Sequence, residues 1–448
     1  MDSAPRILIL VLILFGLYPA FANNQLRADQ ASCDQIRTAC KNAGFVLGGG
    51  ARDGLLLDCY QPIVQGTPQP KLASRPLPRI NPKVVNACRS GNGSVGAKTA
   101  SVDEATRPEP LLASTDDSAP GGLVVVIVDK PKQDRLDLRA LDNTSISGVA
   151  LQIHWGDIEP VEGKPDWTKL DQLFAAAESS KKWVQLLIFP GFFSPPWALE
   201  GVKTEQFPIQ YGPGAGTVMS LPMPWDNVYL NRWFSFLRLL NEKYGKSPAF
   251  RLIGAAGPTS VSAEMTLPSN PEVMRTWQSD GYTSRKYIEA WQKVFQVYSK
   301  ELPNQNISFS LGAGLNINNQ GKIEPGEGMR TRQTVIDQAV GLLGRRFALQ
   351  DSDLSAGPVQ RPAGINLVTS YSGRIITGLQ LRTSAERESA DMGAAGNPPL
   401  ALRKCIELGM RPNQAGRHIN YLEMYEPDIL ADDMQPVLTY ATSLFKAN

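Results

Sequence analysis

Histidine is nearly absent from this chain of 448 residues, which contains only His154 and His418. A metal site built from three histidines is therefore impossible, and a site held by histidines alone is not expected. An excess of charge of one sign is missing as well, because 45 Lys and Arg residues are balanced by 43 Asp and Glu residues. This balance gives no electrostatic reason to expect nucleic acid as a partner. We expect no metal and no cofactor.

Long apolar runs are confined to the start of the chain. Arg6 precedes the apolar run 7–18, and the small-residue pattern Ala20-Phe21-Ala22 follows it. This order is typical of a cleaved signal peptide, and the run is short for a membrane-spanning helix, which needs about 20 residues. We therefore predict that residues 1–22 are a signal peptide, with an uncleaved anchor as the alternative. The mature protein is then expected to be secreted or periplasmic, without membrane contact.

Cysteines are few, and four of the five fall in one short stretch: Cys33, Cys40, Cys59 and Cys88. A segment this short has a marginal core, so we predict that two disulfides staple residues 23–90 into a small module, with all three pairings open. Metal binding is the alternative, but no C-x-x-C spacing and no nearby histidine support it. Residues 91–120 have the composition of a linker. Cys405 lies alone in an apolar helical segment and is predicted to be a buried free thiol.

From residue 121 onward, apolar runs of strand length alternate with segments of helical periodicity. Eight such runs are present: Leu123–Val128, Val149–Trp155, Trp183–Phe189, Phe250–Ala255, Ile307–Leu311, Phe347–Gln350, Ile375–Leu381 and Ile419–Met424. Eight strand–helix units predict an α/β fold, a (β/α)8 TIM barrel over residues 121–448. An open doubly wound sheet is the alternative, but no G-x-G-x-x-G follows a strand. In a barrel, the active site lies at the C-terminal ends of the strands.

Motifs with a recognisable order follow the second and third runs: Trp155, Ile158-Glu159-Pro160-Val161-Glu162-Gly163, Asp166-Trp167, Leu170-Asp171 and Pro195-Pro196-Trp197. They resemble the second β/α unit and the next loop of β-galactosidase-like glycoside hydrolases, which are barrel enzymes that use two glutamates. The segment Trp233–Ala249 is similar to the approach to their fourth strand. The resemblance covers roughly residues 149–264.

The resemblance implies that Glu264, after the fourth run, is the general acid/base. The family commonly has Asn-Glu at this point, whereas this chain has Ala263-Glu264. The missing amide would hydrogen-bond the sugar near its 2-hydroxyl group. A catalytically silent barrel that binds a glycan or a cell-envelope partner is therefore the alternative function, with Glu264 as a surface-loop carboxylate.

A second carboxylate is predicted at Glu423, in the eighth run between Tyr421 and Tyr425. A glutamate in an apolar strand requires a reason, because an unpaired buried charge is costly. The family's nucleophile lies on the seventh strand, but there this chain has Gln380, with Glu386 as an alternative in the loop beyond.

Glycosidic bond cleavage needs two carboxyl groups in different states, because one gives a proton to the leaving oxygen and the other stays ionised to attack the sugar. We therefore predict an exported glycoside hydrolase that acts on a β-linked oligo- or polysaccharide. We expect retention, with inversion as the alternative, since the separation of the two carboxyl groups decides between them. Side chains expected to line its cleft lie near the strand ends: His154, Trp155, Phe192, Trp197, Trp225 and Tyr425. Each ring alone is more often core packing, but as a set they favour a sugar cleft. A serine triad is not expected, because no G-x-S-x-G is present.

Overall fold

The computed structural model describes residues 32–45, 55–66, 69, 73–91, 119–130, 133–209 and 214–446. The chain divides into two compact units, which lie within residues 1–110 and 111–448. The predicted signal peptide, residues 1–22, lies outside the described residues, as does most of the predicted linker 91–120.

The larger unit is a closed barrel of parallel strands in the order β1-β10-β9-β8-β7-β6-β3-β2. Its strands are β1 (Gly122–Val128), β2 (Ile146–His154), β3 (Trp183–Phe189), β6 (Phe250–Gly254), β7 (Asn306–Ser310), β8 (Phe347–Leu354), β9 (Ile376–Leu381) and β10 (Tyr421–Tyr425). Closure places Gly122 of β1 opposite Tyr421 of β10. All eight predicted runs are strands, so the predicted (β/α)8 barrel is confirmed and the open sheet is excluded.

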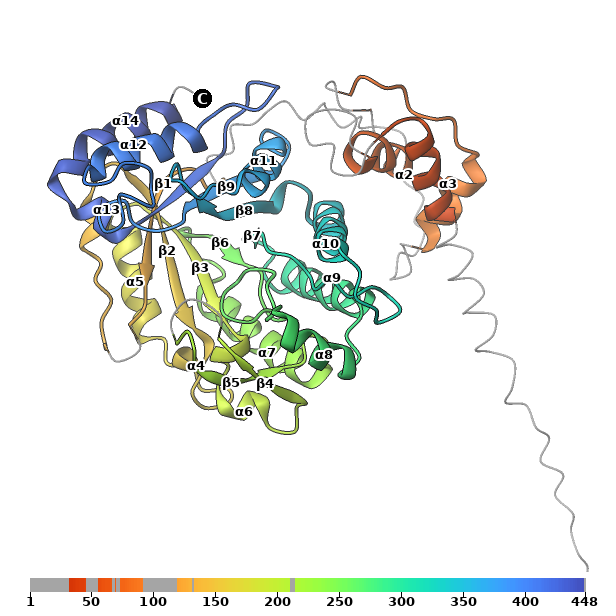
Figure 1. The fold of residues 1–448 in the computed structure, drawn as a ribbon, viewed down its shortest axis with the longest axis horizontal. Helices are drawn as coiled ribbons and strands as arrows, with labels where there is room; N and C mark the ends of the chain where they lie inside the picture. Colours follow the sequence, from red (N-terminus) through yellow and green to blue (C-terminus); the bar gives the residue numbers. More distant parts are fainter. Residues whose placement is uncertain are drawn as a thin grey trace, which may run out of the picture. The chain divides into compact units, whose positions relative to one another are not determined.

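Helices surround the strands, as Figure 1 shows. The longer ones are α5 (Thr168–Ser179), α7 (Asn227–Tyr244), α8 (Pro271–Ser279), α9 (Ser284–Glu301), α10 (Glu327–Leu343), α11 (Pro362–Ser370), α12 (Pro398–Gly409) and α14 (Gln435–Lys446). Short helices and 3₁₀ turns complete the barrel: η2 (Arg139–Asp142), α4 (Trp155–Ile158), η3 (Gly191–Phe193), α6 (Pro196–Leu199), η4 (Gly344–Arg346), α13 (Glu426–Leu430) and η5 (Asp432–Met434). An antiparallel hairpin, β4 (Thr204–Pro208) and β5 (Val218–Pro222), lies between β3 and α7.

Helix α7 illustrates how the sequence sets these elements. The Asp226 side chain accepts hydrogen bonds from the backbone N–H groups of Val228 and Tyr229, and this capping starts the helix. Its buried face repeats every three or four residues: Tyr229, Trp233, Phe236, Leu237, Leu240 and Tyr244. Packing of that face against the barrel is what stabilises the helix.

The smaller unit is held by the two predicted disulfides, and the structure decides their pairing. Cys33 pairs with Cys88, and Cys40 pairs with Cys59, at Cα–Cα distances of 4.8 and 5.9 Å. They join the helical segment 32–42 to η1 (Leu55–Tyr60, a π-helix) and to α3 (Pro82–Gly91), with α2 (Gln61–Gln65) between these two. The core contains the four half-cystines with Ile36, Phe45, Leu55 and Tyr60. With every cysteine of this unit in a disulfide, the metal alternative fails.

Cys405 lies on α12 and is a buried free cysteine, as predicted. In the part of the chain that the structure describes, no helix is both long enough and apolar enough to cross a membrane.

Candidate active site

Polar side chains meet inside the barrel from strands that are not neighbours in the sheet. Gln185 of β3 donates from Nε2 to Oε1 of Gln350 of β8, at 3.2 Å. Gln350 in turn donates from Nε2 to Oε2 of Glu423 of β10, at 2.9 Å. Because β3, β8 and β10 do not pair with one another, these contacts place all three side chains in the barrel interior.

Glu423 has no exposed surface. Burial raises the pKa of its carboxyl group to about 8, although hydrogen bonds from Gln350 and Gln185 oppose the shift. Its second oxygen, Oε1, is buried without a hydrogen-bond partner. The carboxyl group is therefore predominantly protonated at neutral pH, and one of its oxygens has no hydrogen-bond partner.

Glu264 lies in the loop after β6, the fourth strand of the barrel, where its backbone forms a bridge to Ser310 at the end of β7. Its amide N–H donates to the Ser262 hydroxyl oxygen at 3.2 Å. The residue is half-buried. Burial raises the pKa of its carboxyl group to about 7, a bond with Ser352 lowers it, and the charge of Asp351 raises it. A carboxyl group with this pKa can donate a proton near neutral pH.

Tyr425 connects the two glutamates electrostatically. Burial raises the pKa of its phenol to about 12, and the negative charges of both Glu423 and Glu264 contribute to the increase. Neither glutamate contributes to the pKa shift of the other. Both carboxyl groups therefore lie close enough to Tyr425 for their charges to act on its phenol.

Two of the aromatic residues expected in the cleft are buried in packing instead. Trp155 is completely buried, and its indole ring packs edge-on against Trp197 and Trp233. Phe192 is 3% exposed. Neither ring has a face open to a ligand, so we assign both to the core.

Glu159, in the motif that carries the resemblance, explains the burial of Trp155. Its Oε2 accepts from the indole N–H of Trp155 at 2.8 Å, and its Oε1 accepts from the backbone N–H of Gly163 at 2.8 Å. The bond from the N–H of Glu159 to the carbonyl of Trp155 also closes the short helix α4. The sequence predicts that Trp155 ends the second strand. Because of this backbone bond, Trp155 begins the helix α4 instead.

The remaining predicted side chains are half-buried. His154 ends β2, where its ring stacks on Phe193 with centroids 3.9 Å apart and its Nδ1 lies 3.2 Å from a carboxylate oxygen of Asp157. Trp197 donates from its indole N–H to the backbone carbonyl of Glu159 at 2.9 Å. Trp225 belongs to a group with Trp277 and Tyr282 on the α8–α9 side of the barrel.

Three glutamines inside the barrel were not predicted as site residues. Gln185, Gln350 and Gln380 are each at least 96% buried. The sequence does contain a signal for them, because each is a lone amide within an otherwise apolar strand, and a buried amide needs partners. Which partners they find depends on the closure of the barrel.

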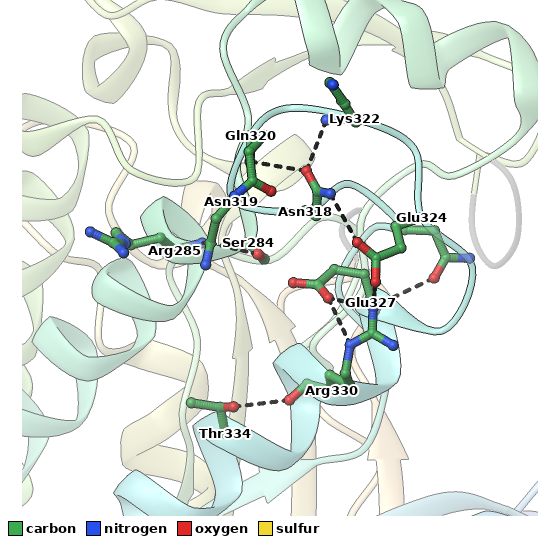
Figure 2. A network of polar contacts seen from close by, with 12 residues as sticks. Ser284, Arg285, Asn318, Asn319, Gln320, Lys322, Glu324, Glu327, Arg330 and Thr334 are labelled. Carbon is green, nitrogen blue, oxygen red and sulfur yellow. Dashed lines mark hydrogen bonds and ion pairs between the residues drawn. The ribbon is translucent and has the colours of Figure 1, made fainter. Parts of the chain in front are cut away.

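A separate network of polar contacts fixes the loop between β7 and α10 (Figure 2). The Asn318 side chain accepts from two backbone N–H groups of its own loop and donates to Glu324 at 2.9 Å. Asn319 accepts from the Ser284 hydroxyl group at 2.8 Å. Arg330 forms an ion pair with Glu324. These contacts anchor the loop that follows β7. Glu264 forms its backbone bridge to the last residue of that strand, Ser310.

Among the described residues, no group of three or more His, Cys, Asp or Glu side chains is placed to hold a metal ion.

No family model matches the chain, and no curated protein matches it. Among solved structures, the chain is similar to xylanase B from Clostridium stercorarium F9, with a TM-score of 0.40 and 10% identity over 68% of this chain and 86% of that chain. The fold assignment rests on the closed barrel of eight parallel strands itself.

Proposed function

We propose that the barrel is a retaining glycoside hydrolase that cleaves a β-linked oligo- or polysaccharide. Glu264 is the general acid/base, and Glu423 is the nucleophile. The observation that carries the proposal is the state of Glu264, a half-buried carboxyl group beyond the C-terminal end of the fourth strand with a pKa raised to about 7. The C-terminal ends of the strands are where a (β/α)8 enzyme keeps its catalytic groups. A pKa near 7 keeps the carboxyl group protonated often enough to act as a general acid.

The reaction takes two steps. In the first, Glu264 gives its proton to the glycosidic oxygen while Glu423 Oε1, the oxygen without a partner, attacks the anomeric carbon. The bond between the anomeric carbon and the glycosidic oxygen breaks, and the leaving sugar departs as an alcohol. In the second, the Glu264 carboxylate takes a proton from water, and the water oxygen displaces Glu423 from the same carbon.

Attack requires an ionised Glu423, although the pKa of about 8 keeps this carboxyl group mostly protonated in the empty site. The positive charge that develops on the sugar favours the ionised form, because an opposite charge nearby lowers the pKa of a carboxyl group. His154, Trp197, Trp225 and Tyr425, which are all half-buried, remain the proposed sugar contacts.

A silent barrel that binds a glycan or a cell-envelope partner is the second candidate, and three observations favour it. The seventh strand carries Gln380 instead of a carboxylate. Glu423 has no exposed surface, so a sugar reaches it only if a neighbouring side chain moves. Carboxyl groups at the separation of about 5–5.5 Å that retention uses would raise each other's pKa, and no such effect is present between Glu264 and Glu423.

A digestion screen decides between the candidates. The full chain and its Glu264→Gln variant are incubated with a panel of β-linked polysaccharides, and reducing ends and binding are both measured. Hydrolysis by the wild type, lost in the variant while binding persists, supports the enzyme, and NMR of the first-formed anomer tests retention. Binding by both proteins without any hydrolysis supports the silent barrel instead.

We further propose that the chain is exported to an oxidising compartment, secreted or periplasmic, after removal of residues 1–22. The two disulfides of the small unit support this location, because such bonds persist where thiols are not kept reduced. The proposed organisation is a module at 23–90, a linker at 91–120 and the barrel at 121–448.

A further inference from the structure

The amide of Gln350 has both of its ends engaged. Its Oε1 accepts from the Tyr421 hydroxyl group at 2.7 Å and from Nε2 of Gln185 at 3.2 Å. Its Nε2 donates to Oε2 of Glu423 at 2.9 Å. Because two donors hold the oxygen end, the nitrogen end is directed at the carboxyl group.

We propose that Gln350, supported by Gln185 and Tyr421, is a positioning residue that holds Glu423 in either protonation state, because the direction of the hydrogen bonds can reverse. The hydrogen bonds of the structure suit the ionised form, in which the carboxylate accepts from Gln350 Nε2. When Glu423 takes up one proton from solvent, its O–H donates to Gln350 Oε1 after both amides rotate. Gln350 Nε2 then donates to the Tyr421 hydroxyl oxygen and to Gln185 Oε1.

An unsatisfied atom supports the reversal. Gln185 Oε1 is buried without a partner in the present arrangement, as is Oε1 of Glu423. A buried acceptor left unpaired destabilises the fold, because it has lost its hydrogen bonds to water. Reversal gives Gln185 Oε1 a donor, and it leaves Glu423 with an uncharged carbonyl oxygen, whose lack of a partner costs less than that of a charged one. In exchange, the Tyr421 hydroxyl group and Gln185 Nε2 lose Gln350 Oε1 as their acceptor.

The surroundings of Glu423 make these amides its main support. On its own strand it has Tyr421 and Tyr425, whose pKa values burial raises, so both phenols stay neutral. On β1 the residue in register with it is Val124, and on β9 it is Gln380, which donates to the Tyr425 hydroxyl group at 3.0 Å. The charge of Glu264 reaches Tyr425 and does not contribute to the pKa of Glu423.

The proposed function enters this inference only through the catalytic role of Glu423. The hydrogen bonds of Gln350 can therefore be tested without a glycan. Urea unfolding of the full chain is measured from pH 5 to pH 10 by tryptophan fluorescence, which reports on the barrel because all eight tryptophans lie after residue 121. The difference in unfolding free energy between wild type and Glu423→Gln isolates the titration of Glu423. Because the pKa of Glu423 is raised in the folded state, the wild type should lose stability relative to Glu423→Gln as pH rises from 5. The loss should end at a bend near the folded pKa of about 8.

Gln350→Met keeps the length of the side chain and removes the donor. The difference in unfolding free energy is then taken between Gln350→Met and the double variant Gln350→Met/Glu423→Gln. Its bend should lie about one pH unit higher than in the wild-type comparison, because a hydrogen bond to the charged carboxylate is lost. Gln380→Met is the matched control, an equally buried amide on β9 that bonds Tyr425 instead, and it should leave the bend in place. An unmoved bend in Gln350→Met, or an equal movement in Gln380→Met, overturns the positioning role.

Gln185→Met provides a second variant if Gln350→Met does not fold, and it should move the bend in the same direction by less. The reversal itself is tested by NMR of the side-chain amide nitrogens in labelled protein. The signals of Gln185 and Gln350 should change together around the same pH, and Glu423→Gln should abolish that change. Amide signals that stay constant through the titration overturn the reversal. If these results hold while no glycan is cleaved, only the proposed enzyme function fails.

Discussion

Glu423 on β10 lies directly opposite Gln380 on β9, in register across the parallel pair. The seventh strand of the barrel, β9, thus has the amide of Gln380 where the resemblance implies a carboxylate. The carboxyl group of Glu423 lies beside it on the eighth strand, β10. The eight strands have the order that the sequence predicted. The strand count is therefore correct, and Glu423 lies on the eighth strand of the barrel and not on the seventh.

Glu264→Gln removes the transferable proton and keeps the shape of the side chain. We expect kcat on an unactivated glycan to fall by roughly 10²–10⁴-fold, and by less on an activated aryl glycoside, whose leaving group needs little protonation. Steady-state kinetics on both substrates measure the contrast. An equal loss on the two substrates would show that Glu264 is not the acid.

Glu423→Gln should abolish turnover on both substrates, because no covalent intermediate can form. The variant should remain folded, since a neutral amide replaces a carboxyl group that is mostly protonated. Glu386→Gln is the control, because Glu386 is exposed in the loop after β9, and it should retain activity. Full activity in Glu423→Gln would assign this residue to structure alone.

The two pKa values predict an unusual pH dependence. In the proposed mechanism, turnover needs Glu264 protonated and Glu423 ionised, yet their pKa values are about 7 and about 8. As pH rises, Glu264 loses its proton before Glu423 does, so the competent form is a minor one, and its population peaks between about pH 7 and pH 8. We expect a bell-shaped profile of kcat/KM with its maximum in that interval.

The same profile in Glu264→Gln, measured on an aryl glycoside, should lose its falling limb and rise through about pH 8, where Glu423 ionises. A wild-type maximum below pH 6 would contradict the assignment of both groups.

Glu159 should act on stability rather than on chemistry. Both of its oxygens accept hydrogen bonds, so Glu159→Gln places an NH₂ group against an N–H donor. We expect the unfolding free energy to fall by about 1–3 kcal/mol. Glu162→Gln, an exposed glutamate of the same motif, should change it by less than about 0.5 kcal/mol. Urea unfolding of the two variants compares them.

Reduction of the disulfides should unfold the smaller unit and leave the barrel folded. Both disulfides lie in the smaller unit, and the eight tryptophans lie in the barrel. A reducing agent should therefore expose the module to proteolysis and leave the thermal transition of tryptophan fluorescence in place. A shift of that transition by many degrees would contradict independent folding.

The sequence by itself determined the alternation of strands and helices. Apolar runs such as Trp183–Phe189 and helical stripes such as that of α7 depend on local periodicity, which is present in the order of residues. The clustering of four cysteines likewise indicated a disulfide module. The sequence pattern does not determine which cysteines pair, because the pairing depends on which helices pack together.

Only the tertiary structure decided the environment of each candidate side chain. Trp155 and Trp197 look equivalent in sequence, yet one is completely buried against Glu159 and the other is half-buried. Gln185 and Gln350 are 165 residues apart, and no pattern in the chain connects them to Glu423. Closing the barrel brings strands that are not neighbours into contact across its interior, and that contact determines which carboxyl group is buried, what it bonds to and how readily it ionises.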